Sequence, residues 1–180
     1  MQGKNIIYGN RGMGLEEDIN KTNEYYLINN IASIYKKPTP ITIAKVDYKN
    51  QIIKEAYFKI PSTTDYNGIY KGKYIDFEAK ETNLDYFPIN NIHNHQIKHL
   101  ETVLNMGGIS FIIVRFNKKN QVYLLPTMKL LDFIENGGRK SISLDYFKDN
   151  GYLLDYKYNP RLDYLKVIDE IGGTYEKEKE

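Results

Sequence analysis

Charged side chains near the middle of the chain have the types and spacing of a hydrolytic metal site. Residues 75–80 alternate between apolar side chains and acidic or basic ones, which is the pattern of a half-buried strand. Asp76, Glu78 and Lys80 therefore share one face of the predicted strand, because every second side chain points the same way. Asp65 lies upstream on a separate segment. Carboxylates from two segments with a lysine one step along the strand suit a metal-dependent phosphodiesterase.

The chemistry expected of this group follows from the properties of Mg²⁺. This cation takes oxygen ligands, usually one or two carboxylates with waters and substrate phosphate, and Asp65 and Glu78 could supply the carboxylates. The ion would acidify a water and stabilise the leaving oxygen, while Lys80 would orient the water or stabilise the pentacovalent charge. Asp76 would tune the site or hold Lys80. Acidic and basic residues also alternate on many solvated sheet faces, so the motif alone is not specific.

Turn signals indicate how the two segments meet. Asn67-Gly68 and Lys71-Gly72 bracket the short segment Ile69-Tyr70. We expect that segment to pair with residues 74–80 as a hairpin, which would bring Asp65 towards the acidic face of the strand.

The other elements follow from periodicity and helix breakers. A helical pattern begins at Leu15 and should end near Lys36-Lys37, because Pro38 and Pro40 cannot continue a helix. Further expected elements are strands over 41–46, 51–58, 109–116 and 121–125, helices over 89–106, 126–135, 141–150 and 162–171, and an extended piece over 151–156.

Length and composition indicate a single globular domain. The 180 residues suffice for one core, and 27% charged and 41% hydrophobic residues are ordinary values. The absence of cysteine excludes disulfides and thiolate metal sites and fits a cytoplasmic setting. No stretch approaches the roughly 20 apolar residues of a membrane span, and residues 1–10 lack the apolar run of a signal peptide. We therefore expect a cytoplasmic protein with no membrane partner.

Charge and histidine content bear on the ligand. The net charge is only +2, but nine lysines and five acidic residues fall between positions 36 and 80. Local basic surface of this kind attracts a phosphate backbone, although a lysine-rich solvated surface would look the same. His95 and His99 are four residues apart, as on one face of a helix, but a chain without cysteine offers few further zinc ligands.

Unusual blocks of sequence are spread over nearly the whole chain, from about Asn10 to about Ile171. They read RGM at 11–13, KKPTP at 36–40, EAYF at 55–58, STTDYNG at 62–68, YIDFEAKET at 74–82, GRKSI at 138–142 and PRLDY at 160–164. Together they closely resemble the RecU family of Holliday junction resolvases. The Asp65, Glu78 and Lys80 group then corresponds to the family's variant of the PD-(D/E)XK nuclease motif.

The resemblance implies an architecture. We expect an α/β fold with a restriction-endonuclease-like mixed sheet flanked by helices, forming a single nuclease domain over 1–180. A β stalk over about 45–62 would project and insert into the centre of the four-way junction. Residues 172–180 read as a flexible, charged tail.

The resemblance also implies roles for further residues. Thr63 and Gln96, the latter through its carbonyl oxygen, would complete the metal shell. Arg11 would contact DNA or modulate activity, and Lys36 and Lys37 would contact DNA.

Two more expectations concern the stalk and the first helix. Tyr57 and Phe58 would stack on or wedge against bases, but alternation along the strand favours at most one ring being free and one buried. Glu16 is favourably placed for the dipole of the first helix. A first-helix glutamate often approaches the metal in PD-(D/E)XK nucleases, so both interpretations stay open for Glu16.

The expected activity is symmetric, Mg²⁺-dependent nicking of Holliday junctions during recombination and DNA repair, with Mn²⁺ as a substitute. Two symmetric cuts need two active sites and therefore a homodimer. A strand-exchange recombinase and a branch-migration helicase are further possible partners. Two alternatives stay open: a repair or restriction-like nuclease of the same superfamily acting on linear duplex, and a non-catalytic junction-binding accessory that modulates the recombinase.

Overall fold

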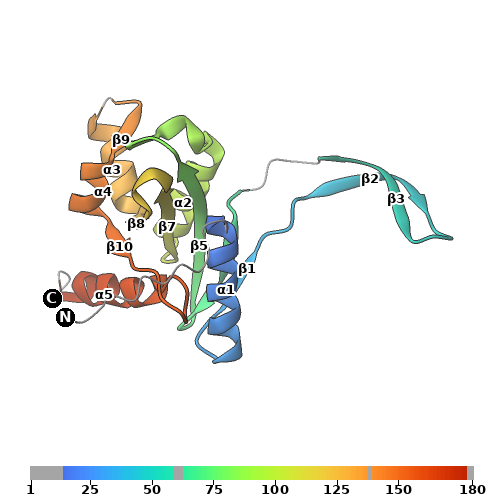
Figure 1. The fold of residues 1–180 in the computed structure, drawn as a ribbon, viewed down its shortest axis with the longest axis horizontal. Helices are drawn as coiled ribbons and strands as arrows, with labels where there is room; N and C mark the ends of the chain where they lie inside the picture. The colour runs from blue at the N-terminus through green and yellow to red at the C-terminus, as the bar shows by residue number, and fades with distance from the viewer. Residues whose placement is uncertain (1–13, 59–62, 138, 178–180) are drawn as a thin grey trace, which may run out of the picture.

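A six-stranded mixed sheet forms the centre of the molecule in the computed structural model (Figure 1). The structure describes residues 14–58, 63–137 and 139–177, with side chains described as far as residue 172. The strands lie in the order β1 (Ser33–Lys36), β4 (Tyr66–Tyr70), β5 (Lys73–Thr82), β7 (Ile109–Phe116), β8 (Gln121–Pro126) and β10 (Tyr152–Leu154). Strands β5 and β7 run parallel and every other neighbouring pair is antiparallel.

Helices cover both faces of this sheet and divide the core into two clusters. On one face, α1 (Leu15–Ile28) and α5 (Tyr164–Lys177) pack on apolar side chains of β5 and β7. On the other face lie α2 (Asn94–Asn105), α3 (Thr127–Gly137) and α4 (Leu144–Asn150). This arrangement confirms the predicted mixed α/β core. No helix in the described part of the chain is both long and apolar enough to cross a membrane.

Strand β5 is buried on both faces, which the sequence pattern did not reveal. Ile75, Phe77 and Ala79 point into the cluster under α1 and α5, as predicted. Asp76 and Glu78 point the other way, yet both are fully buried, because α2 lies over them and contacts both carboxylates. The two acids therefore sit in a low-dielectric interior rather than on a solvated sheet face.

The β4–β5 hairpin is confirmed, but only one of the two predicted turns is a turn. Lys71 and Gly72 have φ values of 47° and 75°, the left-handed pair that a two-residue hairpin loop needs. Asn67-Gly68 instead lies inside β4. A side chain on Gly68 would place its Cβ only 2.0 Å from the backbone oxygen of Ser33, so glycine is needed here for the close approach of β1.

The first helix is shorter than predicted, and this difference adds a strand to the sheet. Helix α1 ends at Ile28, and Asn30 adopts a left-handed conformation with φ of 55°, which asparagine tolerates better than most residues. The chain then reverses and residues 33–36 pair with β4 as an edge strand. The apolar residues Ile31 and Ile34 fit the spacing of a continuing helix, but residues 33–36 instead pair their backbone with β4.

Two other predicted helices begin later in the chain than expected. The segment expected to be helical from residue 89 contains a 3-10 turn, η1 (Ile89–Asn91), and α2 begins only at Asn94. Within the predicted helix 141–150, residues 141–143 form β9 (Ser141–Ser143), which pairs with β6 (Tyr86–Pro88). Ser143 caps α4 by accepting a hydrogen bond from the Tyr146 backbone. The remaining 3-10 turn, η2 (Asn117–Lys119), connects β7 to β8.

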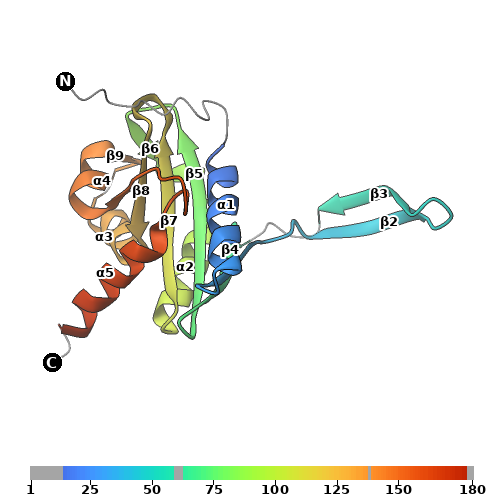
Figure 2. The same ribbon diagram turned by 60° about the horizontal axis from the view of Figure 1, so that its bottom comes forward.

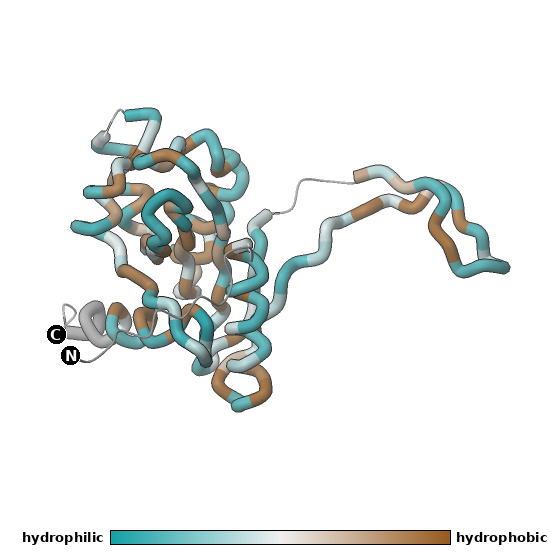
Figure 3. The backbone as a smooth tube through the Cα atoms, in the orientation of Figure 1, coloured by the Kyte–Doolittle hydropathy of each residue, from teal (hydrophilic) through white to brown (hydrophobic). Residues whose placement is uncertain are grey.

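A two-stranded hairpin projects far from the body, as Figures 1 and 2 show. Its strands are β2 (Ile41–Asp47) and β3 (Ile52–Phe58), which pair with each other and with no other strand in the described residues. The predicted projection is thereby confirmed, although it begins at Ile41 rather than near residue 45, and residues 59–62 lie outside the described part. Figure 3 shows hydrophobic positions along this hairpin, yet neither core cluster of the described residues includes a residue of β2 or β3.

Candidate active site

Strand β5 and the residue preceding β4 bring the three predicted catalytic side chains together. Asp65 lies just before β4, and its carboxylate accepts a hydrogen bond from the backbone N–H of Ala79 at 3.1 Å. Glu78 and Lys80 follow each other on one face of β5, and the Lys80 ammonium lies 2.5 Å from Glu78 Oε1. The predicted juxtaposition of two carboxylates and a lysine is therefore present in the structure.

Burial gives Glu78 unusual electrostatics. The side chain is fully buried, and this burial, with a smaller contribution from the neighbouring Asp65 carboxylate, raises the pKa of Glu78 to about 7. The Lys80 ammonium acts in the opposite direction. Two acids held this close repel each other when both are ionised, so the site favours a positive charge between them.

The donor set fits a hard divalent cation. Glu78 Oε1 accepts from the side-chain amide of Gln96 at 2.7 Å, but Glu78 Oε2 is buried and no described group donates a hydrogen bond to it. A buried carboxylate oxygen without a donor is costly and is available as a metal ligand. The described residues contain no group of three or more histidine or acidic side chains arranged to hold a metal. Two carboxylates completed by water and substrate phosphate are characteristic of Mg²⁺ rather than zinc.

The two predicted accessory ligands lie beside the site, but their polar groups are engaged elsewhere. Gln96 directs its amide nitrogen at Glu78, while its carbonyl oxygen accepts from the His93 backbone at the start of α2. The Thr63 hydroxyl is 3.0 Å from the Lys37 ammonium. Coordination of a metal by Thr63 or by the Gln96 carbonyl therefore stays a prediction.

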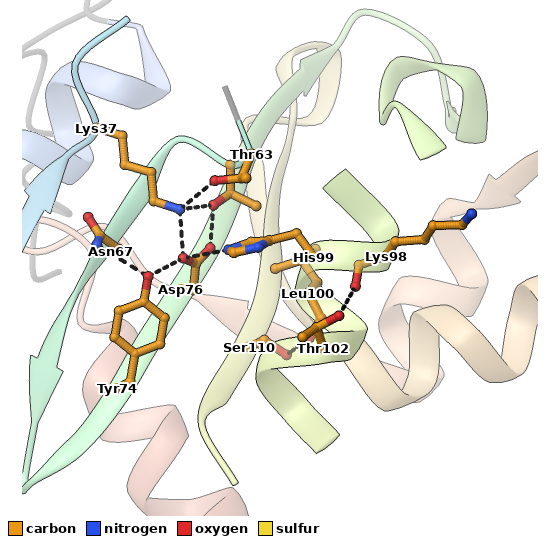
Figure 4. Close-up of polar contacts among 11 residues, drawn as sticks. Lys37, Thr63, Asn67, Tyr74, Asp76, Lys98, His99, Leu100, Thr102 and Ser110 are labelled. Atoms are coloured by element: carbon orange, nitrogen blue, oxygen red, sulfur yellow. Dashed lines mark hydrogen bonds and ion pairs between the residues drawn. The ribbon is translucent and has the colours of Figure 1, made fainter. Parts of the chain in front are cut away.

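Asp76 does not hold Lys80, as one sequence interpretation had it, and is instead the centre of a separate polar network (Figure 4). Asp76 Oδ2 lies 2.6 Å from the Lys37 ammonium, 2.8 Å from the Tyr74 hydroxyl and 3.1 Å from His99 Nε2. Its other oxygen accepts from the Thr64 hydroxyl. A fully buried carboxylate with four partners is held in one position.

The remaining predicted residues lie on the surface or outside the described part of the chain. Glu16 forms an ion pair with Lys36 on the surface. Burial, with a further contribution from the negative charge of Glu16, raises the pKa of Tyr66, which follows Asp65 in the chain. Tyr57 and Phe58 are both exposed, at 58% and 83%, so neither ring packs in a core. Arg11 lies outside the described residues.

Sequence reasoning missed several members of the Asp76 network. Lys37 was expected at the DNA, yet only 14% of its side chain is exposed. Thr64, Tyr74 and His99 were assigned no role. A signal existed for Tyr74, which precedes Asp76 by two positions and so shares its face of β5. His99 could have been found from Gln96, because residues three apart lie on the same side of a helix.

Comparison with known proteins gives consistent matches over most of the chain. The family model described as "RecU: Recombination protein U" matches residues 10–170. A Holliday junction resolvase RecU from Bacillus cytotoxicus is 51% identical over 175 residues, covering 93% of this chain and 88% of that protein. A protein of the same name from Pediococcus pentosaceus is 55% identical over 172 residues, covering 92% and 86%. Among solved structures, Archaeoglobus fulgidus Hjc, a Holliday junction resolvase, is 12% identical with a TM-score of 0.45, covering 75% of this chain and 92% of that one.

Proposed function

The chain belongs to the RecU family, and on that premise we propose that it is an endonuclease that resolves Holliday junctions by metal-dependent hydrolysis of phosphodiester bonds. The observation that carries the proposal is the group formed by Asp65, Glu78 and Lys80, in which one buried carboxylate oxygen accepts no hydrogen bond from the described residues. This group lies at the base of a projecting hairpin with two exposed aromatic rings. A cutting site and a surface for unstacked bases thus occur in one molecule.

We propose that Asp65 and Glu78 hold Mg²⁺, or Mn²⁺ in its place, with Thr63 and Gln96 as further candidate ligands. When bound, such an ion lowers the pKa of a coordinated water and stabilises the leaving oxygen. Lys80 has 26% of its side chain exposed and its ammonium against Glu78. We propose that it orients the attacking water and stabilises charge at the scissile phosphate.

We propose that the hairpin enters the centre of the junction. An isolated two-stranded hairpin gains little stability on its own, so its exposed rings are better explained by a binding partner than by folding. Tyr57 and Phe58 present π faces on which unpaired bases can stack. We propose that Lys36 contacts phosphate after exchanging its partner Glu16 for the nucleic acid, and that Arg11 is a further DNA contact.

Resolution of a junction into two nicked duplexes needs two cuts related by symmetry. We therefore propose that the chain acts as a homodimer in which each protomer cuts one strand. Contacts with a strand-exchange recombinase or a branch-migration helicase stay predictions that rest on the resemblance.

The test is cleavage of a mobile four-way junction beside linear duplex of the same sequence, with and without Mg²⁺. We expect paired, symmetric nicks in the junction alone and no cleavage without the metal. Cleavage of both substrates would replace the proposal with a general nuclease. Tight junction binding without cleavage in Mg²⁺ or Mn²⁺ would replace it with a non-catalytic accessory.

A further inference from the structure

The two legs of the projecting hairpin meet at the active site. The chain leaves the body for the hairpin after Lys37 and is back at the body by Thr63, two residues before the candidate metal ligand Asp65. The backbone N–H of Lys37 donates to the backbone oxygen of Asp65 at 2.7 Å. The outgoing leg is thus bonded directly to the residue that must face Glu78.

The Lys37 side chain ties the same leg to the returning one and to β5. Its ammonium lies 3.0 Å from the Thr63 hydroxyl, 2.6 Å from the Thr64 hydroxyl and 2.6 Å from Asp76. These three contacts match the three donors of an ammonium group. An ammonium with three protein acceptors and little exposure has no vacant donor to offer a phosphate.

Asp76 is the fixed point to which Lys37 is anchored. Its carboxylate is fully buried and is also held by Tyr74 on β5 and His99 on α2 (Figure 4). Helix α2 carries Gln96, which donates to Glu78. The network therefore joins both legs of the hairpin to the strand and the helix that hold the second metal ligand.

From this geometry we propose that Lys37 and Asp76 form a clamp at the base of the hairpin that positions Asp65 against Glu78. The proposal rests on the proposed nuclease function and deepens it, because it makes Lys37 a positioning residue of the reaction instead of a phosphate contact. It also implies that movement of the hairpin can affect the cleavage reaction. A tilt of the outgoing leg would act on the Lys37 to Asp65 bond and so on the separation of the two carboxylates.

The test compares Lys37→Met, Asp76→Asn and the double variant with wild type. The matched control is Lys148→Met, which removes the same kind of ammonium from a lysine–aspartate pair on α4, remote from the site. Cleavage is measured in a single turnover with a saturating excess of protein over four-way junction in Mg²⁺, and junction affinity is measured separately in EDTA. The position of Asp65 is followed without DNA or metal through the amide resonance of Ala79, whose N–H donates to the Asp65 carboxylate.

We expect each single variant to lose about 10- to 100-fold in single-turnover rate, the range for a small misplacement of reacting groups, with little change in junction affinity. The double variant should lose little more than either single one, because the two side chains act as a unit. The Ala79 resonance should shift in all three variants and stay in place in Lys148→Met. Asp76→Asn keeps the size of the side chain and one acceptor oxygen, so it carries the test if Lys37→Met does not fold.

Two results would overturn the clamp. Weaker junction binding by Lys37→Met with an unchanged single-turnover rate would make Lys37 a phosphate contact. Wild-type rate and an unshifted Ala79 resonance in both single variants would leave the network without a role in the reaction. Absence of cleavage by wild type in the same assay would instead count against the proposed function, so the two failures are distinguishable.

Discussion

The projecting hairpin and strand β5 are both strands with apolar side chains, yet they meet opposite surroundings. Ile75 and Phe77 on β5 are fully buried, whereas Ile43, Ile52 and Phe58 on the hairpin are exposed at 49%, 54% and 83%. Strand β5 is covered by helices on both faces, and β2 and β3 are covered by nothing among the described residues. Apolar residues on β5 therefore serve folding, while those on the hairpin are available for binding.

The largest expected effect separates cutting from binding. Asp65→Ala removes one of the two carboxylates of the proposed metal site, and loss of metal assistance worth several kcal/mol should lower the cleavage rate on the order of 10³-fold or more. Junction affinity should persist, because the hairpin is untouched. Single-turnover cleavage and gel-shift binding of the same four-way junction measure the two effects. A variant that cuts as fast as wild type would show that the site is wrongly assigned.

The second prediction compares how much an aromatic ring on β5 and one on the hairpin contribute to the free energy of unfolding. Phe77 stacks between the rings of Tyr66 and Phe111, with centroids 4.9 and 4.7 Å away. Phe77→Ala should lower the free energy of unfolding by about 3–5 kcal/mol, the cost of deleting a buried aromatic ring. Phe58→Ala, the matched change on the hairpin, should stay within about 0.5 kcal/mol because its ring is exposed. Urea unfolding followed by circular dichroism measures both, and equal losses would erase the distinction between the two strands.

The aromatic rings of the hairpin should contribute to DNA binding although they contribute little to stability. Tyr57→Ala and Phe58→Ala should each weaken junction binding by about 1–3 kcal/mol, the range for loss of one base-stacking aromatic ring. Binding of linear duplex should change less, because its bases are already stacked. Ile43→Ala is the control, since it trims an exposed apolar side chain of the same hairpin without removing an aromatic face. Equal losses on junction and duplex would mean that the rings contribute general affinity rather than junction selectivity.

The same contrast explains how much of the molecule could be predicted from its sequence. Alternation identified β5 and its face correctly because it depends on neighbouring residues alone. Complete burial of Glu78 and Asp76 could not be predicted, because α2 and its Gln96 and His99 arrive from elsewhere in the chain. The predicted end of α1 was wrong for a related reason. The pairing of residues 33–36 with β4 is a non-local contact, and it outweighed the local helical pattern. The exposure of both Tyr57 and Phe58 likewise depends on the absence of a covering layer.

The smallest expected effect is on the pH dependence of stability, and it compares one carboxylate on the hairpin with one on β5. Asp47 on the hairpin has its pKa lowered by hydrogen bonds from Lys54 and Asn50, whereas burial and Asp65 raise the pKa of Glu78 to about 7. Folded Glu78 therefore holds its proton more tightly than the unfolded chain does. Without a divalent cation, this group should make stability fall as pH rises from about 4.5, the ordinary pKa of glutamate, to about 7.

Replacing Asp65 by Asn should weaken this pH dependence, because it removes the negative charge that opposes ionisation of Glu78 while keeping an acceptor for the Ala79 N–H. In EDTA near pH 7.5 the variant should be more stable than wild type by on the order of 1 kcal/mol, the free energy of one pKa unit. Mg²⁺ should raise the thermal midpoint of wild type and leave Asp65→Asn nearly unchanged, since the cation stabilises only a protein that binds it. Asp47→Asn is the control: its carboxyl titrates below this window, so the slope between pH 4.5 and 7 should match wild type. A loss of stability in Asp65→Asn at neutral pH would mean that the Asp65 charge stabilises the fold. It would contradict the view that the Asp65 and Glu78 carboxylates repel each other until a cation binds.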